Sequence, residues 1–113
     1  MITEHHANVP PAVRAWLAAH GLHDADAEIA QMTDNVVVVD NGIEYSGRAA
    51  ARAWSASVNE KFEYSATVLT ADVHGDAVVA TTHVEGDFPG SPINLRYQFL
   101  LSDGLISALT VSA

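Results

Sequence analysis

Hydrophobic residues recur at helical spacing in the first third of the chain, whereas apolar and polar residues alternate in the last half. The first pattern predicts a helix that begins near Pro10-Pro11, where a missing amide hydrogen is tolerated, and ends at Gly21. Its buried face is predicted to contain Val13, Trp16, Leu17 and His20. Asp24 is a typical cap for a second helix, whose buried side is predicted to contain Ile29 and Met32.

A strand and a tight turn are predicted after these two helices. Residues 35–40 hold four consecutive valines before Asp40, and β-branched side chains of this kind disfavour a helix. Asn41-Gly42 is typical of a two-residue hairpin turn, because both residues tolerate a positive φ. A third helix is then predicted to be capped by Ser46. One face of this helix is formed by Ala50, Ala51, Trp54 and Val58.

The rest of the chain has the period of two that is typical of strands. Strands are predicted near 62–73, 77–87, 93–102 and 105–112. Because the segments between them are short, these strands should form an antiparallel meander. The predicted fold class is therefore α+β, with three N-terminal helices packed on one face of a strongly curved antiparallel sheet, in a single domain that spans residues 1–113.

Composition narrows the range of partners. The net charge is −9 and the 5 Lys and Arg residues are scattered, so neither a nucleic acid nor an anionic membrane surface is an expected partner. The apolar runs are too short to span a membrane, and the first residues lack the pattern of a signal peptide, which predicts a cytoplasmic protein. The chain has no Cys, which excludes disulfides and thiolate metal sites.

No cofactor or metal is predicted. One strand face carries His83, Glu85 and Asp87. Alternate residues of a strand lie too far apart to close easily around one ion, however. The sequence also contains no Gly-rich phosphate loop.

The order of the predicted elements resembles the nuclear transport factor 2-like fold, and specifically its SnoaL-like and ketosteroid-isomerase-like branch. The resemblance rests on HDAD at 23–26, TDN at 33–35, VVVVD at 36–40 and YSGRAA at 45–50, and it spans nearly the whole chain. It implies a cone in which three helices and a bent sheet enclose an apolar cavity that is open at one end. A small hydrophobic molecule is the partner that this resemblance implies.

The resemblance also implies candidate catalytic residues. In the isomerase branch a carboxylate base stands at the end of the strand after the second helix, and Asp40 occupies this position. The oxyanion hole of that branch combines a tyrosine of the first helix with a carboxylic acid of a late strand. The matching residues here are Trp16 and Tyr97, and these departures weigh against a steroid isomerase. Tyr97 can still donate a hydrogen bond.

Asp40 has two interpretations that the sequence leaves open. It shares a strand face with Val36 and Val38, because side chains alternate along a strand. If this face lines the cavity, the exclusion of water should make the carboxylate a usable general base. An Asp that precedes Asn-Gly is also an ordinary turn residue, which forms hydrogen bonds with its own backbone.

The strand predicted near 77–87 has two contrasting faces. Its more apolar face consists of Val78, Ala80, Thr82 and Val84. Alternation alone assigns this face to the core. The resemblance implies the opposite, with Thr81, His83 and Glu85 facing the cavity and the apolar face left for a subunit contact. His83 would then act as a proton shuttle near Asp40, since imidazole exchanges protons near neutral pH. The alternative interpretation is that His83 is an exposed strand residue.

The strand predicted near 93–102 carries the remaining candidates. Tyr97 and Phe99 share an apolar face and are expected to line the cavity. Because a buried tyrosine hydroxyl needs a polar partner, Tyr97 is a candidate hydrogen-bond donor as well as a core residue. Additional ligand contacts are expected from Trp16, Val38 and Trp54, and the two tryptophans are equally explained as core residues.

These residues support an enzyme hypothesis. Asp40 would act as general base, and Tyr97 with His83 would stabilise negative charge on a small hydrophobic carbonyl or epoxide compound. SnoaL-like proteins include polyketide cyclases, so the resemblance implies isomerisation, aldol-type cyclisation or hydration. An epoxide hydrolase is disfavoured. Arg96 and Tyr97 are neighbours on one predicted strand, so their side chains should point to opposite faces of the sheet.

Two alternatives stay open beside the enzyme hypothesis. The chain would then be a non-catalytic ligand-binding module, or a dimeric interaction module with a filled core. A homodimer through the outer sheet face is expected in every case. It would use Leu100 and the apolar face of the 77–87 strand, because an exposed apolar patch of this kind usually marks a contact.

Overall fold

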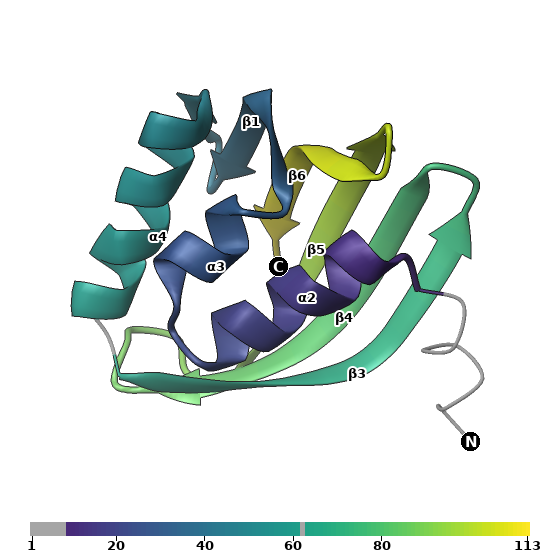
Figure 1. Ribbon diagram of the computed structural model, residues 1–113. Coiled ribbons are helices and arrows are strands. Elements are labelled where there is room, and N and C mark those ends of the chain that lie inside the picture. The colour runs from purple at the N-terminus through teal and green to yellow at the C-terminus, as the bar shows by residue number, and fades with distance from the viewer. Residues whose placement is uncertain (1–8, 62) are drawn as a thin grey trace.

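The computed structural model describes residues 9–61 and 63–113 and has the predicted α+β architecture. Residues 1–8 and Phe62, which belong to the predicted domain, lie outside the described residues. Within that description, three helices accompany a six-stranded sheet with the strand order β2-β1-β6-β5-β4-β3. Figure 1 shows the sheet curving around α2 and α3, while α4 lies beside β1.

The bounds of the elements agree with the sequence patterns except after the second helix. That helix ends at Ile29, and Met32, which was predicted to lie on it, is the first residue of the following strand. The helices are α2 (Pro11–Gly21), α3 (Ala25–Ile29) and α4 (Arg48–Lys61). The strands are β1 (Met32–Asp40), β2 (Ile43–Ser46), β3 (Tyr64–His74), β4 (Ala77–Gly86), β5 (Ile93–Ser102) and β6 (Leu105–Ser112). Among the described residues, no helix is both long enough and apolar enough to cross a membrane.

The two predicted helix caps have different outcomes. The Asp24 side chain accepts a hydrogen bond of 3.1 Å from the Ala27 amide, so the predicted cap of α3 is confirmed. The predicted cap of α4 at Ser46 is wrong. Ser46 completes β2 and its hydroxyl donates to Glu44, while the carbonyl of the next residue, Gly47, accepts from the Ala51 amide and begins the helix.

The sheet combines a hairpin with a meander. Asn41 and Gly42 have φ angles of 54° and 78°, as the predicted two-residue turn requires, and they connect β1 to β2. Strands β3 to β6 form the predicted antiparallel meander. A parallel pairing of β1 with β6 joins the hairpin to this meander. That pairing places the end of β1 against the middle of the sheet.

The prediction of which face of β4 lines the cavity is wrong. Thr81, His83 and Glu85 point to the outer face of the sheet, and the alternate side chains are buried against the helices. These buried residues are Val78, Ala80, Thr82 and Val84. The cause is the register with β5, which pairs Ala80 with Tyr97 and Val78 with Phe99, so that all four side chains share the inner face. The apolar face of β4 is therefore unavailable for a subunit contact.

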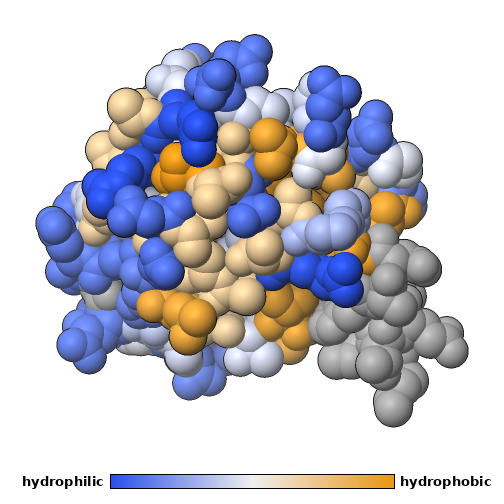
Figure 2. Space-filling view, viewed as in Figure 1, coloured by the Kyte–Doolittle hydropathy of each residue, from blue (hydrophilic) through white to orange (hydrophobic). Residues whose placement is uncertain are grey.

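The core lies between α2 and the inner face of the sheet. Trp16 is fully buried and makes an edge contact with Phe99, at 5.4 Å between ring centroids. Helix α4 adds Ala51 and Trp54 to the same core. Seen from the helix side, weakly hydrophobic residues cover much of the middle of the molecule, with some strongly hydrophobic and some hydrophilic residues among them (Figure 2). The large apolar residues Trp16, Ile29 and Trp54 of the helices are buried.

We predict that replacing Gly86, at the end of β4, by a larger residue destabilises the fold. A Cβ atom at this position would collide with the Glu63 carbonyl oxygen and would lie 2.8 Å from Tyr64 Cβ. Since these obstacles belong to the first residue of β3 and to the residue before it, and neither can move away easily, Gly86→Ala should lower the free energy of unfolding by about 1–3 kcal/mol. Chemical denaturation would measure the change. Gly21→Ala is the matched control, because a Cβ there meets nothing within 4 Å. Equal stability of both variants would contradict the close approach.

Candidate functional site

A cavity of about 420 Å³ opens between α4 and the inner face of the sheet. Most of its wall is apolar, with contributions from Val58, Val84, Phe88, Ile93, Leu95 and Val111. Polar side chains in its wall include Asp40 of β1, His20 of α2 and Tyr97 of β5. A mostly apolar wall with a few polar groups is the usual composition of a small-molecule site.

Asp40 points into this cavity. The Trp54 indole Nε1 donates a hydrogen bond of 2.9 Å to Asp40 Oδ2, so the carboxylate faces α4 and does not fold back over the Asn41-Gly42 turn. The other carboxylate oxygen, Oδ1, has no hydrogen-bond partner among the described residues. One oxygen is thus fixed by the protein and the other is available to a ligand.

Tyr97 is held by a buried chain of polar groups. Its hydroxyl lies 3.0 Å from His20 Nε2, and His20 Nδ1 lies 3.5 Å from Glu28 Oε2. Burial raises the pKa of Tyr97, and nearby Tyr64 and the negative charges of Asp40 and Glu28 raise it further. The Tyr97 hydroxyl therefore keeps its proton at neutral pH.

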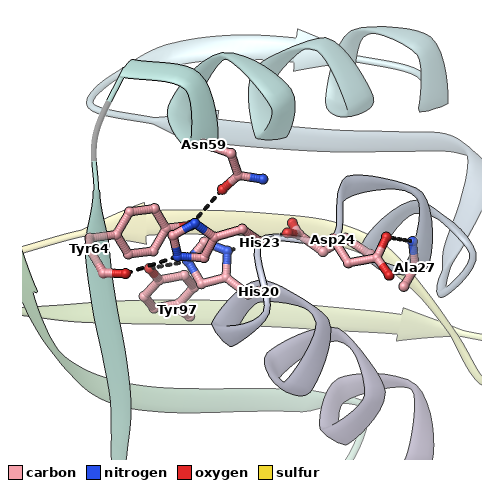
Figure 3. Close-up of polar contacts among 8 residues, drawn as sticks. His20, His23, Asp24, Ala27, Asn59, Tyr64 and Tyr97 are labelled. Carbon is pink, nitrogen blue, oxygen red and sulfur yellow. Dashed lines mark hydrogen bonds and ion pairs between the residues drawn. The ribbon is translucent and has the colours of Figure 1, made fainter.

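A second group of side chains fixes the end of the cavity next to α2. His23 has a positive φ of 57°, which turns the chain after α2 and stacks its ring on Tyr64 at 4.1 Å. His23 Nε2 also lies 2.9 Å from the Tyr64 carbonyl oxygen, and the Tyr64 hydroxyl donates to Asn59 of α4 at 2.8 Å. Figure 3 shows these side chains gathered with His20 and Tyr97. This arrangement ties α2, α4 and β3 together.

The structure brings together only part of the predicted site. Asp40, Tyr97 and Trp54 line the cavity. Trp16, Val38 and Phe99, predicted to contact a ligand, are core residues that lie outside the lining. Each is almost fully buried by neighbouring side chains, which leaves no surface for a ligand.

His83 lies away from the cavity on the outer sheet face. Its Nδ1 atom is 2.8 Å from Asn94 Oδ1, and its Nε2 atom is 2.8 Å from Glu85 Oε1. The expected placement of His83 near Asp40, with Thr81 and Glu85 beside it, is therefore wrong, because the parity of β4 is reversed. Within the described residues, no group of three or more His, Cys, Asp or Glu side chains could hold a metal ion.

Three functional candidates were not predicted from the sequence. His20, Glu28 and Tyr64 lie at or directly behind the cavity wall. A signal existed for His20, since it is the polar member of the otherwise apolar face of α2. No comparable signal marked Glu28, because α3 is only 5 residues long and too short to show a periodic pattern.

Several known proteins are similar to this chain. Residues 13–107 match the family model of the SnoaL-like domain. Among solved structures, a candidate polyketide cyclase from Sinorhizobium meliloti is 31% identical, with a TM-score of 0.89 over 94% of this chain and 97% of its own. None of the curated proteins compared with the chain matches it.

Two more distant structures share the fold. A protein with a ketosteroid isomerase-like fold from Catenulispora acidiphila, in complex with trimethylamine, is 21% identical, with a TM-score of 0.81 over 94% of this chain and 87% of its own. A cystatin-fold protein from Novosphingobium aromaticivorans is 20% identical, with a TM-score of 0.78 over 90% and 95%. The predicted fold resemblance is thus confirmed.

The outer-face position of His83 has a measurable consequence. Hydrogen bonds to Asn94 and Glu85 raise the pKa of His83 above its ordinary value. The pKa of His83 is higher in the folded than in the unfolded state, so these hydrogen bonds stabilise the fold when His83 is protonated. The stabilisation is complete below about pH 6.5 and is lost as the pH rises through the folded-state pKa. Glu85→Ala should lower the pKa of His83 in an NMR titration.

Glu44→Gln is the control for this titration, because Glu44 is an exposed acidic residue on β2 with its hydrogen bond to Ser46. It should leave the titration of His83 unchanged. An unaltered His83 titration in Glu85→Ala would contradict the outer-face pair.

Proposed function

The chain belongs to the SnoaL-like domain family, and on that premise we propose that it is an acid–base enzyme that isomerises or cyclises a small hydrophobic carbonyl compound. The family and the ketosteroid isomerase-like fold support small-molecule isomerase or cyclase chemistry. The observation that carries the proposal is the presence of a carboxylate, Asp40, and a protonated hydroxyl, Tyr97, in the wall of one largely apolar cavity.

Asp40 is the proposed general base. Its Oδ1 atom would remove a proton from the carbon next to the carbonyl group, while Trp54 holds Oδ2 in place. The electron pair of the broken C–H bond would move to the carbonyl oxygen and form an enolate. The apolar wall supports this step, because fixed dipoles act more strongly where water is excluded.

Tyr97 is the proposed hydrogen-bond donor to that enolate. Its hydroxyl keeps its proton because burial raises its pKa, and it can therefore donate to an oxygen that gains negative charge. In an isomerisation, the proton on Asp40 would return to a different carbon. In a cyclisation, the enolate carbon would attack a second carbonyl carbon of the same molecule, and the alkoxide formed there would take up the proton from Asp40. Arg96 shares the outer face with Thr81, its partner in β4, which weighs against an epoxide hydrolase.

Proton exchange at a model ketone tests the role of Asp40. With 2-tetralone in D2O, the protein should accelerate deuterium incorporation next to the carbonyl, and Asp40→Asn should slow it by about 10²–10⁴-fold because amide nitrogen is no base. NMR would follow the exchange and also the binding of the ketone, which should persist. Asp103→Asn, in the exposed turn after β5, is the matched control. Wild-type protein that binds the ketone without accelerating exchange would contradict the proposal.

A non-catalytic binding module is the second candidate. Four aromatic residues line the cavity together with Asp40, namely Trp54, Tyr64, Phe88 and Tyr97. Aromatic faces beside a carboxylate suit a small organic cation. The trimethylamine held by the Catenulispora acidiphila protein is a ligand of this class. Tight binding of tetramethylammonium, together with no exchange at the ketone, would favour this candidate.

We also propose a homodimer through the outer sheet face, with contact residues that differ from those expected from the sequence. One row across four neighbouring strands is uncharged and consists of Val79, Gln98, Thr110 and Val39. The next row adds Ala77, Leu100, Ala108 and Val37, and Leu100 is 52% exposed. In a chain with a net charge of −9, an uncharged surface is where two copies approach with least repulsion.

The dimer proposal predicts the effect of a charge in the uncharged rows. Val79→Lys should convert a dimer at micromolar concentration into a monomer, since it would place two like charges in a buried contact. Sedimentation velocity would measure the species. Ala53→Lys adds the same charge to the exposed side of α4 and should leave the dimer intact. A wild-type protein that sediments only as a monomer would contradict the proposal.

A further inference from the structure

Glu28 is a buried carboxylate that the proposed reaction does not use. Its side chain is 1% exposed, and neither oxygen has a hydrogen-bond partner among the described residues. Its ion-pair contact is with His20, at 3.5 Å between Oε2 and Nδ1. A carboxylate without water is tolerated inside a protein when it is paired with a positive charge. Glu28 therefore favours a positively charged His20.

Two other contacts of His20 favour the same charged form. The ring stacks on Trp16, with 4.7 Å between centroids and 16° between planes, and an indole face attracts a cation. His20 also lies in the last turn of α2, an eleven-residue helix, where the helix dipole favours positive charge. The groups that face the ring from other elements are Glu28 of α3, Tyr64 of β3 and Tyr97 of β5.

The protonation of His20 decides what Tyr97 can do. With hydrogen on Nδ1 alone, Nε2 accepts the Tyr97 proton, and the hydroxyl can only accept from a ligand. With hydrogen on both nitrogens, Nε2 donates to the Tyr97 oxygen, which is 3.0 Å away, and the Tyr97 proton is free for the ligand. The contacts of His20 with Glu28, with Trp16 and with the last turn of α2 fit the second arrangement.

We propose that Glu28 and His20 are positioning residues that hold Tyr97 as a hydrogen-bond donor toward a ligand oxygen in the cavity. The inference rests on the proposed function in assigning the ligand oxygen to a carbonyl or enolate. Neither residue reacts with the ligand. Glu28 acts on His20, and His20 acts on the Tyr97 hydroxyl.

The same chain can move a proton if the ligand oxygen becomes basic enough. The Tyr97 proton passes to the ligand oxygen, and the Nε2 proton of His20 passes to the Tyr97 oxygen. His20 is then neutral with hydrogen on Nδ1, still facing Glu28, and the enolate has become an enol. The reverse transfers restore the chain, so no proton is gained or lost.

Nitrogen NMR and a phenol probe test the proposal. In protein labelled with ¹⁵N-histidine and bound to 4-nitrophenol, both nitrogens of His20 should carry hydrogen at neutral pH. Glu28→Gln keeps the shape of the side chain but removes its charge, and should leave one nitrogen bare. The same variant should weaken binding of 4-nitrophenol about tenfold, as expected for a lost hydrogen bond to a charged oxygen. Glu60→Gln, an exposed change on α4, is the control.

A double variant separates positioning from a structural role. If Glu28 acts through Tyr97, Glu28→Gln should cause no further loss of binding once Tyr97→Phe has removed the hydroxyl. An undiminished loss in the Tyr97→Phe background would overturn the proposal, and so would a wild-type complex in which His20 carries one proton. If Glu28→Gln does not fold, the wild-type nitrogen spectrum decides alone.

Failure of the two proposals can be told apart. Neither the nitrogen spectrum nor the binding of 4-nitrophenol requires turnover or Asp40. A protein that fails to exchange protons at the ketone can still show the doubly protonated His20. Conversely, exchange that depends on Asp40 with a singly protonated His20 would leave the proposed function standing and remove the positioning role.

Discussion

The packing of Trp16 against the inner face of β5 is the contact on which both the fold and the site depend. The indole has no exposed surface and lies 5.4 Å from the ring of Phe99 and 5.6 Å from that of Tyr97. Loss of a buried aromatic side chain typically costs about 3–5 kcal/mol. Because the same indole stacks on His20, the contact that attaches α2 to the sheet also fixes two polar groups of the cavity wall.

The core contains polar groups near the cavity that stability alone does not explain. Both Glu28 carboxylate oxygens and Trp16 Nε1 are buried without hydrogen-bond partners among the described residues. Each such group typically costs about 1–3 kcal/mol, and more when it is charged. Apolar residues of similar size would give a more stable core at these positions. The concentration of these groups behind Tyr97 is therefore more readily explained by a role in the cavity than by a role in folding.

Much of the fold follows from local sequence signals, and the errors have specific physical causes. The valine run and Asn41-Gly42 predict β1 and its turn, because β-branching and positive φ act within a few residues. The pairing of β1 with β6 is a contact between distant segments, and no local pattern encodes it. On β4 the alternation of apolar residues indicates the inner face correctly. The family resemblance instead assigned Thr81, His83 and Glu85 to the inner face, and this assignment is wrong.

The candidate site was predictable only where one residue carried its own signal. Asp40 stands at the end of a strand and Tyr97 on an apolar strand face, and both line the cavity. Glu28 could not be found, because its role depends on burial next to His20 and on the position of α3 against α2. The predicted ligand contacts at Trp16 and Phe99 failed for a related reason. Alternation identifies the inner face of a sheet, but it cannot separate residues that line a cavity from those that fill the core beside it.

Three polar groups of the cavity wall share one structural principle, which is that a protein partner holds each of them before a ligand arrives. Trp54 holds Asp40, His20 holds Tyr97, and Asn59 holds the Tyr64 hydroxyl. Groups fixed in this way need little reorganisation when charge develops on a ligand, and this is the main source of electrostatic stabilisation in enzymes. The partners come from two helices that pack on the sheet through apolar contacts. The accuracy of the polar site therefore derives from the rigidity of the apolar core.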